Sequence, residues 1–191
     1  MNTIELTETE VGIHPLIKMR WSPRAFSTRK IGKDSLEKIF TAASWAASAM
    51  NEQPWHYIYA INGTEGFEKL WSSLNPTNQI WTKNVPVIFA AFYRQNYSLN
   101  GKPNRAAMHD LGMANAHLML QAVSEGIYGH LLGGFDKEKL ADELQISGDL
   151  VPFVMGVLGY PGDPEKLEEP FRTRESKPRT RRSIEEFVVR V

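Results

Sequence analysis

The sequence of 191 residues contains no cysteine, which excludes disulfide bonds, thiolate metal sites and a cysteine nucleophile. An excess of one charge is also absent, since 22 Lys and Arg balance 22 Asp and Glu. This balance argues against a chain whose main partner is nucleic acid or an anionic membrane. The longest apolar run, VPVIFAAF at 85–92, is far shorter than the roughly 20 residues that span a bilayer. The five histidines do not fall at metal-ligand spacing, so we expect no metal site.

Length and composition are those of an ordinary globular protein, with 42% hydrophobic and 23% charged residues. One domain usually occupies roughly 100–200 residues, so we expect a single domain over 1–191 with N-terminal and C-terminal arms. The first ten residues, MNTIELTETE, contain three Glu and no basic residue, unlike a signal peptide. The sequence therefore predicts a cytoplasmic protein.

Hydrophobic spacing predicts a mixed α/β pattern in which helices outnumber strands. An irregular arm with four prolines is expected over 161–178, and 183–191 reads as a strand or a short helix. Asp34 and Asp136 are expected to cap helices. The expected helices are 33–50, 64–74, 105–125 and 136–144, and the expected strands are 55–61, 85–92 and 151–160.

Basic side chains form two separate groups along the chain. Arg20, Ser22 and Arg24 alternate, so in an extended segment their side chains point to one side and suit a phosphate group. An arm that returns to this phosphate would explain the second group, which lies near the C-terminus. A solvated surface remains the alternative for both groups. The second group consists of Arg172, Arg174, Lys177, Arg179, Arg181 and Arg182.

Other candidate segments combine small residues with side-chain amides. Ala47, Ser48 and Ala49 leave room for a flat ligand, and Asn51 follows them with the donor and acceptor groups that suit a heterocycle edge. Asn78 is a second amide. Gly133 and Gly134 would let a backbone N–H approach a planar ligand. Taken singly, each segment is also explained by ordinary turn chemistry. Dinucleotide, Walker A, metalloprotease and hydrolase motifs are absent.

In this order, the segments resemble the nitroreductase family of FMN-dependent NAD(P)H oxidoreductases. The resemblance rests on R-x-S-x-R-x-F at 20–26, N-x-Q-P-W at 51–55, the glycine pair and the terminal arginines, and it covers nearly the whole chain. It implies an α+β sandwich in which helices wrap a mostly antiparallel sheet. It also implies an intertwined homodimer with FMN at the subunit interface, the terminal VVRV crossing onto the partner.

The resemblance assigns FMN-binding roles to twelve residues. Arg20, Ser22 and Arg24 would lie along the phosphate and ribityl chain, and Arg179 and Arg181 would complete the phosphate site. Gly133 and Gly134 would present a backbone N–H to flavin N5. Ala47, Ser48, Ala49 and Asn51 would pack on the flavin from the partner subunit, and Asn78 would turn its amide toward it.

The chemistry implied is ping-pong hydride transfer from NADH or NADPH through FMN to nitroaromatics, quinones or similar small acceptors. No acid–base side chain is required, because the flavin carries the reaction. Ala47, Ala49 and Gly133 depart from residues that are common in the family, and the short stretch 93–109 predicts an open pocket. Two alternatives stay open: a specialised reductive dehalogenase or flavin-fragmenting enzyme, and a flavin-binding protein without turnover.

Overall fold

A computed structural model of the chain describes residues 12–191. The acidic segment 1–10, on which the expectation about a signal peptide depends, lies outside the described residues. Four antiparallel strands form a sheet in the order β1-β2-β4-β3. Their bounds are Trp55–Ile61 for β1, Val87–Arg94 for β2, Tyr128–Leu132 for β3 and Leu150–Gly159 for β4.

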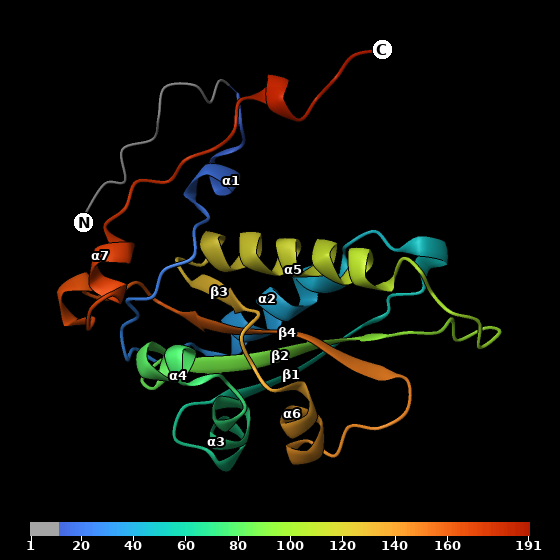
Figure 1. Cartoon of the computed structure of the whole chain (residues 1–191), viewed down its shortest axis with the longest axis horizontal. Helices are drawn as coiled ribbons and strands as arrows, with labels where there is room; N and C mark the ends of the chain where they lie inside the picture. Colours follow the sequence, from blue (N-terminus) through green and yellow to red (C-terminus); the bar gives the residue numbers. More distant parts are fainter. Residues whose placement is uncertain (1–11) are drawn as a thin grey trace.

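Helices cover both faces of the sheet (Figure 1). The helices α2 (Lys33–Ser44) and α5 (Ala107–Ser124) pack against one face. The other face packs against α3, α4, α6 and α7, whose bounds are Glu65–Ser72, Pro76–Thr82, Lys137–Glu143 and Phe171–Glu175. The remaining short helices are α1 at Pro15–Met19, η1 at Ala49–Asn51, η2 at Pro164–Lys166 and η3 at Ile184–Glu186.

The strand β2 lies inside the sheet, and its side chains alternate between two apolar cores. Phe89 and Ala91 join the core beneath α2 and α5. Ile88, Ala90 and Phe92 join the core on the opposite face. Because both faces are covered, this strand is a continuous apolar run rather than an alternation of apolar and polar residues. The longest apolar run of the sequence is therefore explained by its position between two helical layers.

The two ends of the described chain run side by side near α1, beyond the end of α5 (Figure 1). From α7 the chain passes along the segment before and after α1 and then extends away from the sheet. This crossing brings the C-terminal basic residues to the first part of the chain. It is the feature of the fold that positions the candidate site.

The α+β class with an antiparallel sheet wrapped by helices is confirmed. The strand predicted at 55–61 has the predicted bounds, and Asp136 caps α6 by accepting from the Lys139 amide at 3.0 Å. The other predicted strands and the helices at 64–74 and 105–125 lie within two residues of the observed bounds. Within residues 12–191 no helix combines the length and the apolar character needed to cross a membrane.

Two expectations about the helix at 33–50 are wrong. The helix ends at Ser44, because Met50 and Asn51 have left-handed backbone angles, with φ of 55° each, and the Ala49 amide binds the side chain of Asp110 instead. Its N-cap is Gly32, which has no side chain to form a cap, and Asp34 lies inside the first turn.

Among the elements that the sequence patterns did not predict are α1, α4 and β3. The helix α4 begins after Asn75, whose side chain accepts from the Asn78 amide at 2.9 Å, with Pro76 in the first turn. This combination of cap and proline is a recognisable helix start. The strand β3 has only five residues and lacks a clear polar alternation. The arm at 161–178 is also less irregular than expected, because it contains η2 and α7.

Candidate functional site

Three arginines from the two ends of the described chain gather beside α1. The Arg179 guanidinium donates to the carbonyl oxygens of Lys18, at 2.5 Å, and Arg20, at 2.7 Å. Burial, and after it the positive charges of Arg179 and Arg181, lowers the pKa of the Arg20 side chain. A lowered pKa means that the charged form of Arg20 is destabilised where it stands. We call Arg20, Arg179 and Arg181 the basic end of the site.

Within the described residues, the positive charge of the basic end is not paired with a carboxylate. Across residues 12–191, none of its three arginines forms a salt bridge, and neither does the nearby Arg24. The Arg20 guanidinium donates instead to the hydroxyl of Ser22 at 3.3 Å. Converging guanidinium groups without acidic partners repel one another, and a bound anion offsets that repulsion. The arrangement therefore fits a phosphate or another oxyanion.

The segment 20–24, which we call the arginine segment, leaves α1 at Arg20 in an extended conformation, bends at Arg24 and is held by the C-terminal part of the chain. The Glu175 carboxylate, at the end of α7, accepts from the Arg24 amide at 2.9 and 3.0 Å and from the Ala25 amide at 3.0 Å. Arg179 binds carbonyl oxygens of the same stretch from four residues further on. The Glu175 carboxylate thus binds backbone amides of this part of the chain, and the Arg179 guanidinium binds its carbonyl oxygens.

The middle of the site is built where β3 and α4 meet the arginine segment. The Arg24 guanidinium carbon lies 5.9 Å from the centre of the Trp81 ring, close enough for a cation–π contact. The ring of His130, in β3, lies 4.9 Å from that of Trp81. Its Nδ1 is 2.8 Å from the Pro23 carbonyl oxygen. These contacts join the two chain ends to the sheet.

Beyond β3 the chain enters the glycine pair, which packs against the start of α4. The Asn75 amide and the Asn78 side-chain Nδ2 both donate to the Gly134 carbonyl, at 3.1 and 3.0 Å. A Cβ on Gly134 would lie 2.3 Å from Asn75 Nδ2 and 3.0 Å from Asn78 Nδ2, so only glycine fits there. A Cβ on Gly133 would meet no atom within 4 Å. We call Asn75, Asn78, Gly133 and Gly134 the glycine end.

The structure does not bring Ala47, Ser48, Ala49 and Asn51 to either end. The Ala49 amide donates to the Asp110 carboxylate at 3.0 Å, near the start of α5, whereas β3 follows the end of that helix. The Ser48 hydroxyl accepts from the Gln53 amide at 3.1 Å. The length of α5 therefore separates this segment from the glycine end within one chain (Figure 1).

Of the twelve residues singled out from the sequence, eight thus belong to the basic end, the arginine segment or the glycine end, which contacts of His130 and Trp81 connect. Sequence reasoning missed Glu175, His130, Trp81 and Asn75. Asn75 carried a detectable signal, since an asparagine before a proline predicts a helix start. The other three are placed by contacts across 100 or more residues or by a ring contact, for which the sequence holds no local pattern.

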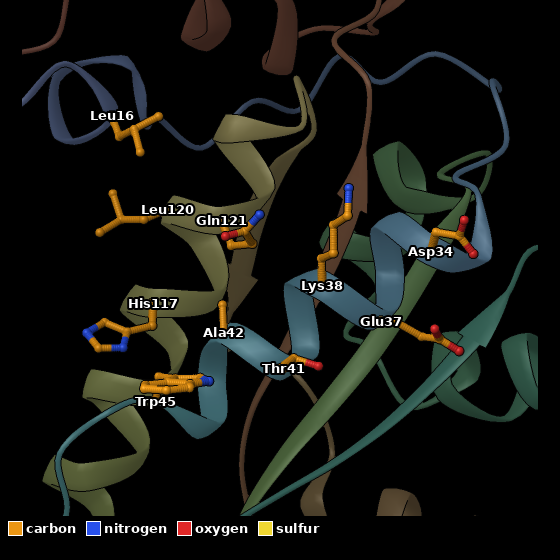
Figure 2. Close-up of a pocket in the computed structure, with 10 residues that line it drawn as sticks. All are labelled: Leu16, Asp34, Glu37, Lys38, Thr41, Ala42, Trp45, His117, Leu120 and Gln121. Atoms are coloured by element: carbon orange, nitrogen blue, oxygen red, sulfur yellow. The ribbon is translucent and has the colours of Figure 1, made fainter.

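A separate open groove, of about 820 Å³, lies between α1, α2 and α5. Figure 2 shows Leu16, Leu120 and Trp45 along it, with His117 next to the Trp45 ring. Trp45 is 80% exposed. None of the twelve residues to which the resemblance assigns FMN binding lines this groove, so we do not regard it as the chemical site. Among residues 12–191, no group of three or more His, Asp or Glu side chains could hold a metal ion.

Comparison with known proteins identifies the same architecture elsewhere. The model of the Nitroreductase family matches residues 17–75 and 65–160. A protein of Archaeoglobus fulgidus described as a "putative NADH dehydrogenase/NAD(P)H nitroreductase" is 30% identical over 158 residues, which are 81% of this chain and 88% of that protein.

Two solved structures extend the comparison to three dimensions. A crystal structure described as an oxidoreductase containing FMN has a TM-score of 0.89 and 30% identity, and the match covers 95% of this chain and 93% of that one. A nitroreductase family protein from Clostridium difficile has a TM-score of 0.69 and 26% identity, with coverage of 91% and 95%.

Proposed function

The chain belongs to the nitroreductase family, and from this premise we propose that it is an FMN-dependent oxidoreductase that passes hydride from NAD(P)H to small electron-poor acceptors. The observation that carries the proposal is the series of contacts from three arginines, which form no salt bridge within residues 12–191, to the glycine pair. The similar structure that contains FMN supports the choice of flavin, and the name of the archaeal relative supports NAD(P)H as donor.

The basic end fits the phosphate of FMN. Arg20, Arg179 and Arg181 supply positive charge, and the Ser22 hydroxyl lies within reach of Arg20. Gly133 follows His130 by three residues along nearly extended chain, a path of roughly 10 Å. A ribityl chain placed along this path would leave the flavin ring beside the glycine end. Arg24, held over Trp81, would stand between the two and face the ring edge.

Bound FMN would supply the redox chemistry, accepting hydride from NAD(P)H and giving it to the acceptor in a ping-pong sequence. The protein's part is to orient and to stabilise charge. A Cβ on Gly133 would meet no atom within 4 Å, so the open space there would leave room for the flavin beside its backbone. Arg24 would stabilise negative charge on the reduced ring. No residue is needed to move a proton at a fixed position, and we assign none.

An open pocket suits small acceptors such as nitroaromatics and quinones. The stretch between β2 and α5 forms a short turn closed by pairing of Asn96 with Pro103, and it holds no helix. Specialised enzymes of the same fold, such as reductive dehalogenases, would need a cover that orders one substrate. The short stretch therefore favours loose selection of acceptors over such a specialised reaction.

The functional unit we propose is a homodimer. The C-terminal tail from Ile184 is apolar but exposed in the single chain, with Phe187 at 65% and Val189 at 81%. The groove of Figure 2 is lined by Leu16, Leu120 and the exposed Trp45. A second copy of the chain would cover both surfaces. It would also bring its own Ala47–Asn51 segment to a flavin that this chain holds, since α5 prevents that within one chain.

A visible absorption spectrum of the purified protein, before and after anaerobic NADH and then NADPH, tests the proposal. A yellow protein that bleaches supports both flavin binding and hydride transfer. Flavin absorption that neither donor bleaches supports the flavin-binding protein without turnover or a specialised enzyme. A colourless protein that takes up no added FMN overturns the proposal.

Truncation after Arg182 tests the dimer separately. Sedimentation velocity is expected to show the full chain as a dimer and the truncated chain as a more readily dissociating species that also loses FMN. A truncated chain that stays a tight dimer would show that the tail does not hold the partner.

A further inference from the structure

His130 is the one histidine of the site, and its ring lies at the junction of three segments. It projects from β3 toward Trp81 in α4, and its Nδ1 reaches the Pro23 carbonyl across 107 residues of sequence. Pro23 is the residue between Ser22 and Arg24, two of the candidate FMN-binding residues. His130 therefore touches the backbone that orients the arginine segment, although it lies behind the side chains that face the anion.

The hydrogen bond defines which nitrogen carries the proton. A carbonyl oxygen only accepts, so the Nδ1 of His130 must donate. Burial, first of all, lowers the pKa of His130 to about 4. Backbone hydrogen bonds to Pro23 and Ser22 act in the opposite direction, and the charges of Arg24 and Arg20 add to the lowering. At neutral pH the ring is thus uncharged, with its proton on Nδ1.

The hydrogen bond from His130 is important because its acceptor is the carbonyl of a proline. Proline has no amide N–H, so the carbonyl is the only hydrogen-bonding backbone group of Pro23 itself. The next two amides, of Arg24 and Ala25, are bound by Glu175. His130 and Glu175 together therefore fasten three successive backbone groups from opposite sides. Fixing the backbone at these groups limits the directions in which the side chains of Ser22 and Arg24 can point.

We propose that His130 is a positioning residue of the anion site: by donating from Nδ1 to Pro23 it holds the arginine segment in the conformation that binds the FMN phosphate. The inference rests on the proposed function for the identity of the anion and adds a residue that acts through Pro23 rather than on the flavin. The charged groups around the ring are Arg20 and Arg24 on the arginine segment, with Glu175 of α7 bound to the backbone of the same segment. A neutral ring adds no further charge to that set.

The test compares His130→Leu, which removes the donor, with His130→Asn, whose side-chain N–H can donate in place of Nδ1. FMN binding to protein freed of flavin is expected to weaken about tenfold in His130→Leu, since a carbonyl loses its donor, and to recover to within about threefold of wild type in His130→Asn. Leu140→Ala serves as the control. It truncates a buried side chain of α6 that takes no part in the hydrogen bonds of His130 and Glu175.

Two further readouts do not depend on activity. Nitrogen-15 spectra are expected to show the Nδ1-protonated form of His130 and a rise of its pKa when FMN binds, because the phosphate offsets the charges of Arg20 and Arg24. Hydrogen exchange of the Arg24 and Ala25 amides is expected to accelerate in His130→Leu but not in Leu140→Ala.

The outcomes separate the two proposals. Wild-type affinity in His130→Leu, or an equal loss in Leu140→Ala, overturns the role of His130 while leaving the proposed function intact. If wild-type protein binds no FMN, the proposed function fails. Hydrogen exchange then decides alone, and unchanged exchange at Arg24 and Ala25 in His130→Leu overturns the positioning role.

Discussion

The two ends of the candidate site are built on different physical principles. The basic end is made of charge: three long side chains from distant parts of the sequence converge, held to backbone oxygens by Arg179. The glycine end is made of shape: Gly134 fits under Asn75 and Asn78 with no room for one more carbon atom. Charge acts over several ångströms and tolerates small displacements, whereas contact at van der Waals distance does not.

This difference implies different tolerance to substitution. At the basic end, a substitution that keeps positive charge should keep part of the function without disturbing the fold. At the glycine end, a single methyl group should disturb the fold and the site together, unless it is placed on Gly133, where the space is open. The contrast can be tested one residue at a time.

Gly134→Ala is expected to have the largest effect. The new methyl group would displace Asn75, which caps α4, so overpacking and loss of the cap together should cost about 3 kcal/mol of unfolding free energy. Thermal denaturation should show a Tm lower by roughly 6–12 °C. Gly133→Ala is the matched control and should melt within a degree or two of wild type. An equal fall in Tm in both variants would mean that the space around each glycine does not determine the stability of the glycine end.

Arg20→Ala is expected to weaken FMN binding by roughly 10–100-fold, since a hydrogen bond to a charged group contributes about 1.5–3 kcal/mol. Arg20→Lys keeps the charge but not the forked geometry and should fall between Arg20→Ala and wild type. Equilibrium dialysis against FMN measures all three. Unchanged Tm in both variants would sharpen the contrast with Gly134, and unchanged affinity would remove Arg20 from the phosphate site.

Stability should fall in mild acid because of His130. Its pKa is about 4 when folded, against 6.5 when unfolded, so the unfolded chain binds a proton that the folded chain refuses. This contribution is complete above pH 6.5 and is lost as the pH falls toward 4, by about 2 kcal/mol at pH 5. Urea denaturation at pH 7 and pH 5 should show the difference in wild type and not in His130→Asn. His56, whose pKa burial and Arg94 also lower, remains in both proteins and cancels.

Glu175→Ala is expected to have the smallest effect of the four. The amides of Arg24 and Ala25 would lose their acceptor in a half-buried setting, a loss of about 1–2 kcal/mol, and Tm should drop by roughly 2–8 °C. FMN affinity should fall with it, because the arginine segment is no longer held. Glu165→Ala, which removes only a distant surface contact of 3.9 Å with Arg172, is the control. If Glu175→Ala binds FMN with wild-type affinity, the hydrogen bonds from Glu175 to the backbone of the arginine segment are not required for FMN binding.

Local patterns predicted much of the fold, for physical reasons that can be named. The strand at 55–61 and the long helix near 107–124 follow from period and propensity over many residues. The helix predicted to reach Met50 failed because a tertiary contact, from Ala49 to Asp110, overrides local preference at a helix end. The strand β3 was not predicted, because its five residues show no alternation of apolar and polar side chains. Pairing with β4 defines this strand.

The candidate site divides in the same way. Side chains whose chemistry is intrinsic, such as Arg20, Arg179 and the glycine pair, could be picked out from the sequence, because a guanidinium or a missing Cβ keeps its meaning in any fold. Their arrangement could not. Glu175 and His130 act through backbone groups more than 100 residues away, and no local pattern encodes such a partner.

By itself, then, the sequence determined the class of fold, the absence of thiol chemistry and the residue types able to bind an anion beside a planar ligand. Only the tertiary structure decided that the two chain ends cross, that Arg179 binds the carbonyls of Lys18 and Arg20, and that Ala47–Asn51 lies apart from them. The reason is that composition and periodicity act over neighbouring residues. Convergence of charge depends instead on where the completed sheet and helices carry the chain.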